Sequence, residues 1–302
     1  MGDLLVVGSV ALDSVKTPFG QVAEALGGSA TYFSFAASFF TTVRVVAVVG
    51  EDFPGEHLSL LKSREVDLSG LQVSKGKTFR WVGEYGYNLN EARTLDTQLN
   101  VFGNFRPVLP DALRKTPFVF LANIDPDLQL EVLRQMARPR LVALDTMNFW
   151  IEGKREALLR VLAEVDALLV NDAEARQLAR EPNLIKAARA ILGFGPRIVV
   201  VKRGEYGALM ISDSHFFFVP AYPLESVFDP TGAGDTFAGG FMGYLAKSEA
   251  TDVDAIRRAI VYGSVMASFT VEDFSLHRLA RLKPEEIQRR YEAFQDLIRF
   301  EI

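Results

Sequence analysis

Short apolar runs that alternate with segments of helical length limit the fold of this chain more than any other feature. Three such runs, residues 118–122, 141–145 and 167–171, are each followed by a segment with the pattern of a helix. Strands that alternate with helices of about 10–15 residues are typical of parallel βαβ units. We therefore predict an α/β fold with a doubly wound, mostly parallel sheet flanked by helices.

The same criteria predict the remaining elements. Further strands are expected at 4–8, 44–49, 197–202, 208–212 and 216–220, and helices at 30–40, 53–64, 128–137, 154–164, 173–179, 234–247, 252–270 and 284–299.

A segment rich in aromatic residues interrupts this pattern in the first third of the chain. Its aromatic and polar residues interleave, which indicates a sheet with one exposed face. With strands from about 10–18 and 71–102, it predicts a small β-sheet lid inserted in a single domain that spans residues 1–302. Because alternate side chains of a strand share a face, four aromatic residues are expected to lie together: Phe79, Trp81, Tyr85 and Tyr87. This face closes over substrate and excludes water, contacts the lid of a second copy in a homodimer, or packs on the main domain.

Composition excludes several classes of function. The 302 residues include no cysteine, so disulfides, thiolate metal sites and cysteine nucleophiles are excluded. A net charge of −5 gives no sign of a nucleic-acid or anionic membrane partner. The first residues lack a basic segment before an apolar core, and no apolar run approaches about 18 residues. We therefore expect a cytoplasmic protein with neither a signal peptide nor a membrane span.

The stretch DPTGAGDTFAGGF, residues 229–241, places small residues where an extended segment turns into a helix. Gly232, Ala233 and Gly234 let the backbone approach a ligand, and the first N–H groups of a helix lack partners and carry the positive end of its dipole. Together they predict an anion site suited to phosphate. The simpler interpretation is a turn with Asp235 as the helix N-cap. A Walker loop and a dinucleotide fingerprint are excluded, because the lysine of the first and the third glycine of the second are missing.

The same stretch closely resembles the C-terminal signature of the ribokinase-like, or PfkB, family of small-molecule carbohydrate and nucleoside kinases. Shorter motifs that resemble those of the family follow its order along the chain: Gly8-Ser9 with Asp13, Gly27-Gly28-Ser29-Ala30, Gly50-Glu51-Asp52, residues 171–174 (NDAE) and residues 202–207 (KRGEYG). The resemblance implies the ribokinase-like α/β fold with its lid.

A general base and an anion hole in the glycine loop follow from the resemblance. Asp235 is implied to accept the proton of a substrate hydroxyl while that oxygen attacks the γ-phosphate of ATP. The backbone N–H groups of Gly232, Ala233 and Gly234 are implied to hold the oxygens of the transferred phosphoryl group.

Two metal sites are also implied. Asn171 and Glu174 are implied to order water around Mg²⁺, which takes few direct protein ligands. The alternative from the residues themselves is a capping box at a helix start. Asp229 and Thr231 are a candidate site for a monovalent cation such as K⁺, which relatives often bind beside the anion hole with main-chain groups near this position and near residues 271–275.

The nucleotide is implied to bind at a glycine turn that follows a strand. Gly204 and Gly207 shape this turn and Lys202 lies near the phosphates, with a solvated lysine at a strand end as the alternative. The adenine is implied to lie between the turn and the helix that contains Gly263. The small residues of that helix also fit a role in packing alone.

The acceptor is implied to bind beyond the first strand, where α/β sheets place ligands. Asp13 accepts hydrogen bonds from two hydroxyl groups in this interpretation, and an aspartate in a turn is the alternative. Gly27, Gly28 and Ser29 let the backbone approach the substrate. Many sugar kinases of the family have Asn where this chain has Tyr32, and the GGSA form is similar to that of the family's nucleoside kinases.

These residues predict an ATP-dependent phosphotransferase that acts on a hydroxyl of a small sugar, polyol or nucleoside. Residues 145–150 lack the arginine of the family's D-x-N-x-R motif, which argues against a hexose or ketogluconate acceptor. A nucleoside kinase specifically is one alternative. A sensor of the same fold that binds nucleotide without turnover is another. A dehydrogenase is disfavoured because the first strand lacks a dinucleotide fingerprint.

Overall fold

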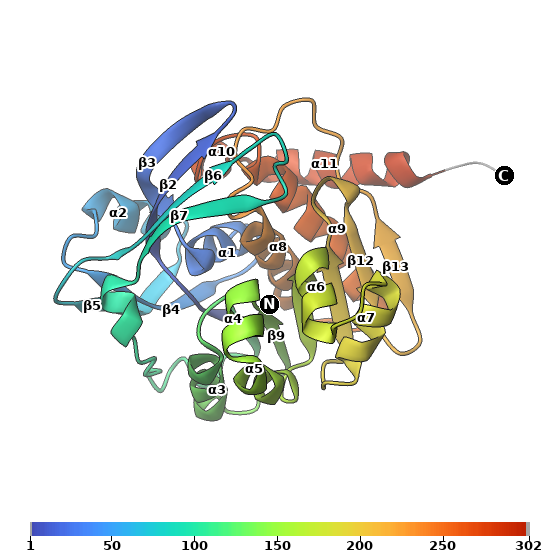
Figure 1. Cartoon of the computed structure of the whole chain (residues 1–302), viewed down its shortest axis with the longest axis horizontal. Coiled ribbons are helices and arrows are strands. Elements are labelled where there is room, and N and C mark those ends of the chain that lie inside the picture. Colours follow the sequence, from blue (N-terminus) through green and yellow to red (C-terminus); the bar gives the residue numbers. More distant parts are fainter. Residues whose placement is uncertain (1, 300–302) are drawn as a thin grey trace.

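A nine-stranded sheet forms the centre of the computed structural model, which describes residues 2–299 (Figure 1). In spatial order its strands are β13 (Phe216–Val219), β12 (Ala208–Ile211), β11 (Ile198–Lys202), β10 (Ala167–Asn171), β9 (Leu141–Asp145), β8 (Phe118–Leu121), β1 (Leu4–Val7), β4 (Val43–Gly50) and β5 (Asp67–Ser74). The pairs from β11 to β5 are parallel, and β12 and β13 add an antiparallel hairpin at one edge. The predicted mostly parallel α/β sheet is therefore confirmed.

Helices cover both faces of this sheet, which is why its strands are apolar on both sides. In β1 the side chains of Leu4 and Val6 join one core, and those of Leu5 and Val7 join the core on the other face. The first core is closed by α1 (Ser29–Ala37), α2 (Gly55–Ser63), α8 (Ala233–Ser248), α9 (Val253–Thr270), α10 (His277–Arg281) and α11 (Pro284–Ile298). The second is closed by α3 (Pro126–Gln135), α4 (Asn148–Gly153), α5 (Arg155–Leu162), α6 (Asp172–Ala179) and α7 (Leu184–Leu192).

A second sheet forms the lid, in the order β3 (Gly20–Gly27), β2 (Ala11–Thr17), β6 (Phe79–Tyr85) and β7 (Ala92–Gln98). Its strands lie together at the upper left of Figure 1. Residues 71–74, which the sequence analysis assigned to the lid, lie instead in β5 of the large sheet.

Four elements were not predicted from the sequence. Strand β3 was missed because most of its side chains are exposed or only half-buried, so its sequence lacks an apolar pattern. Helices α4, α7 and α10 were missed as well. The N-cap of α7 was visible in the sequence, because the Asn183 side chain accepts hydrogen bonds from the N–H groups of Ile185 and Lys186.

Among residues 2–299, no helix combines the length and the apolar character that a membrane span requires.

Candidate active site

The glycine loop forms the N-terminus of α8. Gly232 is the N-cap and has a φ of 73°. Residues other than glycine rarely adopt this left-handed backbone conformation. A Cβ at Gly232 would also lie 2.4 Å from the ring of Tyr32, which comes from α1. The simpler interpretation of Asp235 as the N-cap is wrong, because Asp235 lies in the first turn of α8 and Gly232 precedes it.

The carboxyl group of Asp235 has an unusually high pKa. Its pKa is raised to about 7, first because the group is removed from water and then because the charge of Asp145 opposes its ionisation. Lys202 works in the opposite direction and lowers the pKa. A carboxylate poised near pH 7 is suited to accept a proton in catalysis.

Lys202 and Asp145 form an ion pair beside the loop. The Lys202 Nζ atom lies 3.1 Å from Asp145 Oδ2, and both side chains are largely buried. Nζ also lies 3.0 Å from the point that a Cβ at Gly234 would occupy, so the ammonium group is next to the backbone of the loop. The interpretation of Lys202 as a solvated lysine is therefore wrong.

Asp145 is a site residue that the sequence analysis did not single out. It ends β9, as Lys202 ends β11, and the carboxyl ends of parallel strands meet at one edge of a sheet. An aspartate that closes the otherwise apolar run LVALD was the available signal.

Asp13 is buried in the lid strand β2 and faces the same site. Its Oδ2 atom accepts a hydrogen bond from the N–H of Gly28 at 3.3 Å, and a Cβ at Gly27 would lie only 1.9 Å from that oxygen. Gly27 therefore makes room for the carboxylate, and Gly28 donates a hydrogen bond to it. Burial raises the pKa of Asp13 to about 7, and the charges of Asp235 and Asp229 add to the effect.

Ser29 and Tyr32 line the glycine pair from α1. Ser29 and Ser9 bond reciprocally, each N–H donating to the hydroxyl oxygen of the other at 2.9 and 3.2 Å, which fastens the end of β1 to α1. Tyr32 is fully buried with its ring against Gly232. Burial raises the pKa of its hydroxyl well above the usual value, and the nearby charge of Asp13 contributes. Ser29 thus fixes the start of α1 beside β1, and Tyr32 packs α1 against the glycine loop. Contacts of either residue with substrate stay a prediction.

Asp229 joins the glycine loop to the segment after α9. Its Oδ1 accepts a hydrogen bond from the N–H of Thr231 at 2.9 Å, and its Oδ2 accepts one from the N–H of Ser275 at 3.4 Å. The N–H of Phe228 donates to the carbonyl oxygen of Val271 at 2.8 Å. The two segments implied to hold a monovalent cation are therefore neighbours, and the cation itself stays a prediction.

The glycine turn after β11 has the geometry that the sequence predicted. Gly204 and Gly207 have φ values of 52° and 88°, and the N–H of Arg203 donates to the carbonyl oxygen of Gly207 at 2.8 Å. Gly263 lies apart from this turn, buried where α9 crosses α8. A Cβ there would approach the Phe237 carbonyl oxygen to 2.8 Å, so the structure gives Gly263 a packing role. Its contact with adenine stays a prediction.

Three of the four aromatic residues expected on one face of the lid contact other residues of the same chain. Phe79 stacks on Phe102 with centroids 5.2 Å apart, and Trp81 covers Gly83. Tyr85 reaches the glycine loop, where its hydroxyl oxygen accepts a hydrogen bond from Thr231 Oγ1 at 3.3 Å. Tyr87 departs from the prediction: it follows the end of β6 and is 93% exposed. A homodimer through this face stays a prediction.

Comparison with known proteins gives the family of the chain. The model described as pfkB family carbohydrate kinase matches residues 2–276. The chain belongs to this family.

Relatives and solved structures agree with this assignment. Cytidine kinase of Thermococcus kodakarensis is 32% identical over 80% of this chain and 88% of that protein, and a nucleoside kinase of Methanothermobacter thermautotrophicus is 26% identical over 90% of each. The fold is similar to that of the Methanocaldococcus jannaschii nucleoside kinase, with a TM-score of 0.77, 19% identity and coverage of 97% and 99% of the two chains. It is also similar to a putative ribokinase II from E. coli solved with ATP and Mg²⁺, with a TM-score of 0.79, 18% identity and coverage of 97% and 100%. The protein is a PfkB-family kinase, a phosphotransferase.

The residues beside the loop of this kinase fit a magnesium ion. Asn171 and Glu174 form a capping box at the start of α6, with both reciprocal hydrogen bonds at 2.8 Å. Burial and the charge of Asp145 raise the pKa of Glu174 to about 7, while Lys202 lowers it. Carboxylates that repel one another are stabilised by a dication. Within the described part of the chain, no group of three or more His, Asp or Glu side chains could hold a metal ion directly.

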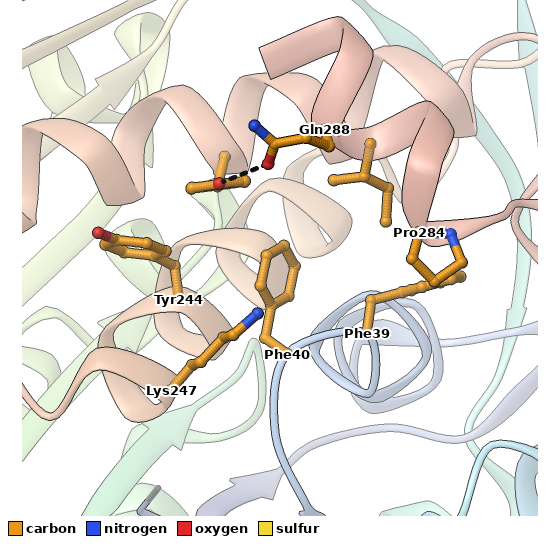
Figure 2. Close-up of a pocket in the computed structure, with 8 residues that line it drawn as sticks. Phe39, Phe40, Tyr244, Lys247, Pro284 and Gln288 are labelled. Carbon is orange, nitrogen blue, oxygen red and sulfur yellow. Dashed lines mark hydrogen bonds between the residues drawn. The ribbon is translucent and has the colours of Figure 1, made fainter. Parts of the chain in front are cut away.

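A separate hollow lies between α1, α8, α9 and α11 (Figure 2). The rings of Tyr244 and Tyr262 line it and stack with centroids 4.8 Å apart, and Tyr262 also stacks on Tyr291 at 4.2 Å. Lys247 and Gln288 supply polar groups at its rim. None of the site residues described above lines it.

Proposed function

We propose that this PfkB kinase transfers the γ-phosphate of ATP to a hydroxymethyl group of a nucleoside. The arrangement at the start of α8 carries the proposal: a partly ionised carboxyl group, Asp235, follows three small residues and lies near the ammonium group of Lys202. Phosphoryl transfer needs positioning and stabilisation of charge, and this arrangement supplies both.

In the proposed reaction Asp235 accepts the proton of the acceptor hydroxyl. The hydroxyl oxygen forms a bond to the γ-phosphorus, the bond from that phosphorus to the bridging oxygen breaks, and ADP leaves with the electron pair. The N–H groups of Gly232, Ala233 and Gly234 hold the oxygens of the transferred group, and Lys202 balances their charge. Asn171 and Glu174 would order the water around Mg²⁺, and the ion would supply positive charge against the nucleotide phosphates.

A nucleoside is favoured over a free sugar or polyol by two observations. A relative that is 32% identical over 80% of this chain is named cytidine kinase. In addition, the amide that many sugar kinases of the family place after the glycine pair is replaced by the buried ring of Tyr32. Asp13 keeps the carboxylate that binds paired hydroxyl groups, and a ribose offers such a pair.

We also propose that K⁺ stabilises the loop around Asp229. Support comes from the hydrogen bonds of this carboxylate to both segments implied to hold the ion. Activity in KCl should exceed that in NaCl at equal ionic strength, and equal rates would contradict this part of the proposal.

An acceptor panel tests the proposed function. ADP formation from Mg-ATP is measured with cytidine, uridine, adenosine, inosine, ribose, a hexose and an inositol. The proposal predicts the highest kcat/KM with a nucleoside. A preference for ribose or inositol would contradict the nucleoside assignment and keep the kinase. Nucleotide binding without turnover of any acceptor would favour the sensor.

A further inference from the structure

The tip of the lid hairpin reaches the nucleotide turn. Residues 86–91 connect β6 to β7, and Asn90 of this tip lies against Gly204. The Asn90 Oδ1 atom is 1.8 Å from the position that a Cβ at Gly204 would take. The carboxamide of the lid therefore fills the space in which a side chain at position 204 would stand.

The orientation of Asn90 is fixed within the hairpin. Its own N–H donates to the Oδ1 atom of Asn88 at 3.2 Å, and the N–H of Glu91 donates to the Asn88 carbonyl oxygen at 3.4 Å. Such a turn, in which an Asn side chain bonds to the backbone two residues on, is a local and defined structure. The side chain of Asn90 is thus presented to the large sheet and needs no rearrangement of the hairpin.

A second contact ties the same hairpin to the other phosphate-binding segment. Tyr85, the last residue of β6, accepts the hydrogen bond from Thr231 at the start of the glycine loop. Tyr85 and Asn90 are close in sequence, yet they contact segments that lie far from the lid and from each other along the chain. One hairpin therefore bridges the anion loop and the nucleotide turn.

We propose that the tip of this hairpin is part of the nucleotide site, and that Asn90 is a positioning residue that holds the Gly204 turn when the lid is closed. Through Tyr85 and Asn90 the lid thereby contacts both the glycine loop and the nucleotide turn. Closure over the acceptor orders the turn that receives ATP, so the two substrates bind with positive coupling. Such coupling is reciprocal, because each ligand stabilises the same closed state.

The absence of cysteine from the chain allows a direct test. Asn90→Cys and, as a matched control from the same tip, Tyr87→Cys each carry a single thiol. The rate of alkylation by N-ethylmaleimide is measured with and without Mg²⁺ and β,γ-methylene-ATP. The proposal predicts that nucleotide slows alkylation at position 90 about fivefold or more and leaves position 87 unchanged. Equal rates with and without nucleotide at position 90, or equal protection at both positions, would overturn it.

A second experiment separates positioning from damage to the turn. The Kd of β,γ-methylene-ATP is measured for Asn90→Ala, with Tyr87→Ala as control, alone and with the acceptor that the panel identifies. The proposal predicts that acceptor tightens nucleotide binding in the control and does so by a much smaller factor in Asn90→Ala. An equal loss of affinity in both conditions would overturn the positioning role. If no acceptor is turned over, the proposed function fails, and the thiol experiment still decides the role of the hairpin.

Discussion

Three carboxyl groups at the site, which come from different elements, have strongly raised pKa values. The pKa values of Asp13, Glu174 and Asp235 are each raised to about 7, chiefly because each carboxyl group is wholly or partly removed from water. Lys202 opposes the shift at Glu174 and Asp235. Without a ligand, the negative charges at the site repel one another. A dication that binds with its nucleotide relieves this repulsion, so its binding is favoured.

The pH dependence of catalysis follows from Asp235. Only its carboxylate accepts a proton, so kcat/KM should be level above pH 7 and fall about tenfold per unit well below it. A profile that stays level down to pH 5 would contradict the assignment.

The same pKa has a consequence for stability. Between the unfolded pKa of 3.8 and the folded value of about 7 the folded state binds the extra proton, so the contribution of Asp235 to stability falls as pH rises through this window. Asp235→Asn should therefore have a Tm a few degrees above the wild type at pH 8, with a smaller difference at pH 5.

Asp145 is expected to position Lys202. Asp145→Asn leaves the ammonium group without its closest partner, and loss of one member of a largely buried pair costs on the order of 3 kcal/mol. A displaced ammonium group should also lower kcat about 10–100-fold. Urea unfolding of Asp145→Asn, Lys202→Met and the double variant measures the coupling, and strictly additive losses would contradict the role.

At the scale of elements, the start of α8 depends on one glycine. Gly232→Ala places a Cβ against the Tyr32 ring and forces a left-handed residue, which costs about 1–3 kcal/mol. Because the ring and the loop must separate, we expect kcat to fall at least about 100-fold. Gly55→Ala is the matched control, since a Cβ at that position meets nothing within 4 Å. Similar activity in the two variants would show that the loop tolerates displacement.

Elements with a strong apolar period could be predicted from the sequence, and contacts between distant segments could not. Apart from β5, the parallel strands of the large sheet lie close to their predicted bounds, as do α8, α9 and α11, because buried runs and amphipathic faces mark them. Strand β3 has no such mark, since its partner β2 and not its own burial defines it.

The same limit applies to the site. The glycine loop was visible as a motif because its chemistry is local. The ion pair between Asp145 and Lys202 and the contact between Asn90 and Gly204 depend on chain segments that only the fold brings together.

At the scale of the whole molecule, the lid contacts the glycine loop through Tyr85. Tyr85→Phe removes one hydroxyl and its hydrogen bond to Thr231 while keeping the ring. A looser lid admits water, so ATP hydrolysis without acceptor should rise severalfold relative to transfer. Tyr87→Phe, at an exposed position, should leave the ratio unchanged. If both variants keep the wild-type ratio, Tyr85 does not hold the lid.

The central claim is that Asp235 and the glycine loop of this PfkB kinase carry phosphoryl transfer. The most direct measurement is a single-turnover reaction with Mg-ATP and the preferred acceptor at pH 8, in which phosphorylated product is followed for the wild type and Asp235→Asn. The account predicts that the variant folds, binds ATP with unchanged affinity and forms product about 10²–10⁴-fold more slowly. Product formation at the wild-type rate by the folded variant would contradict it.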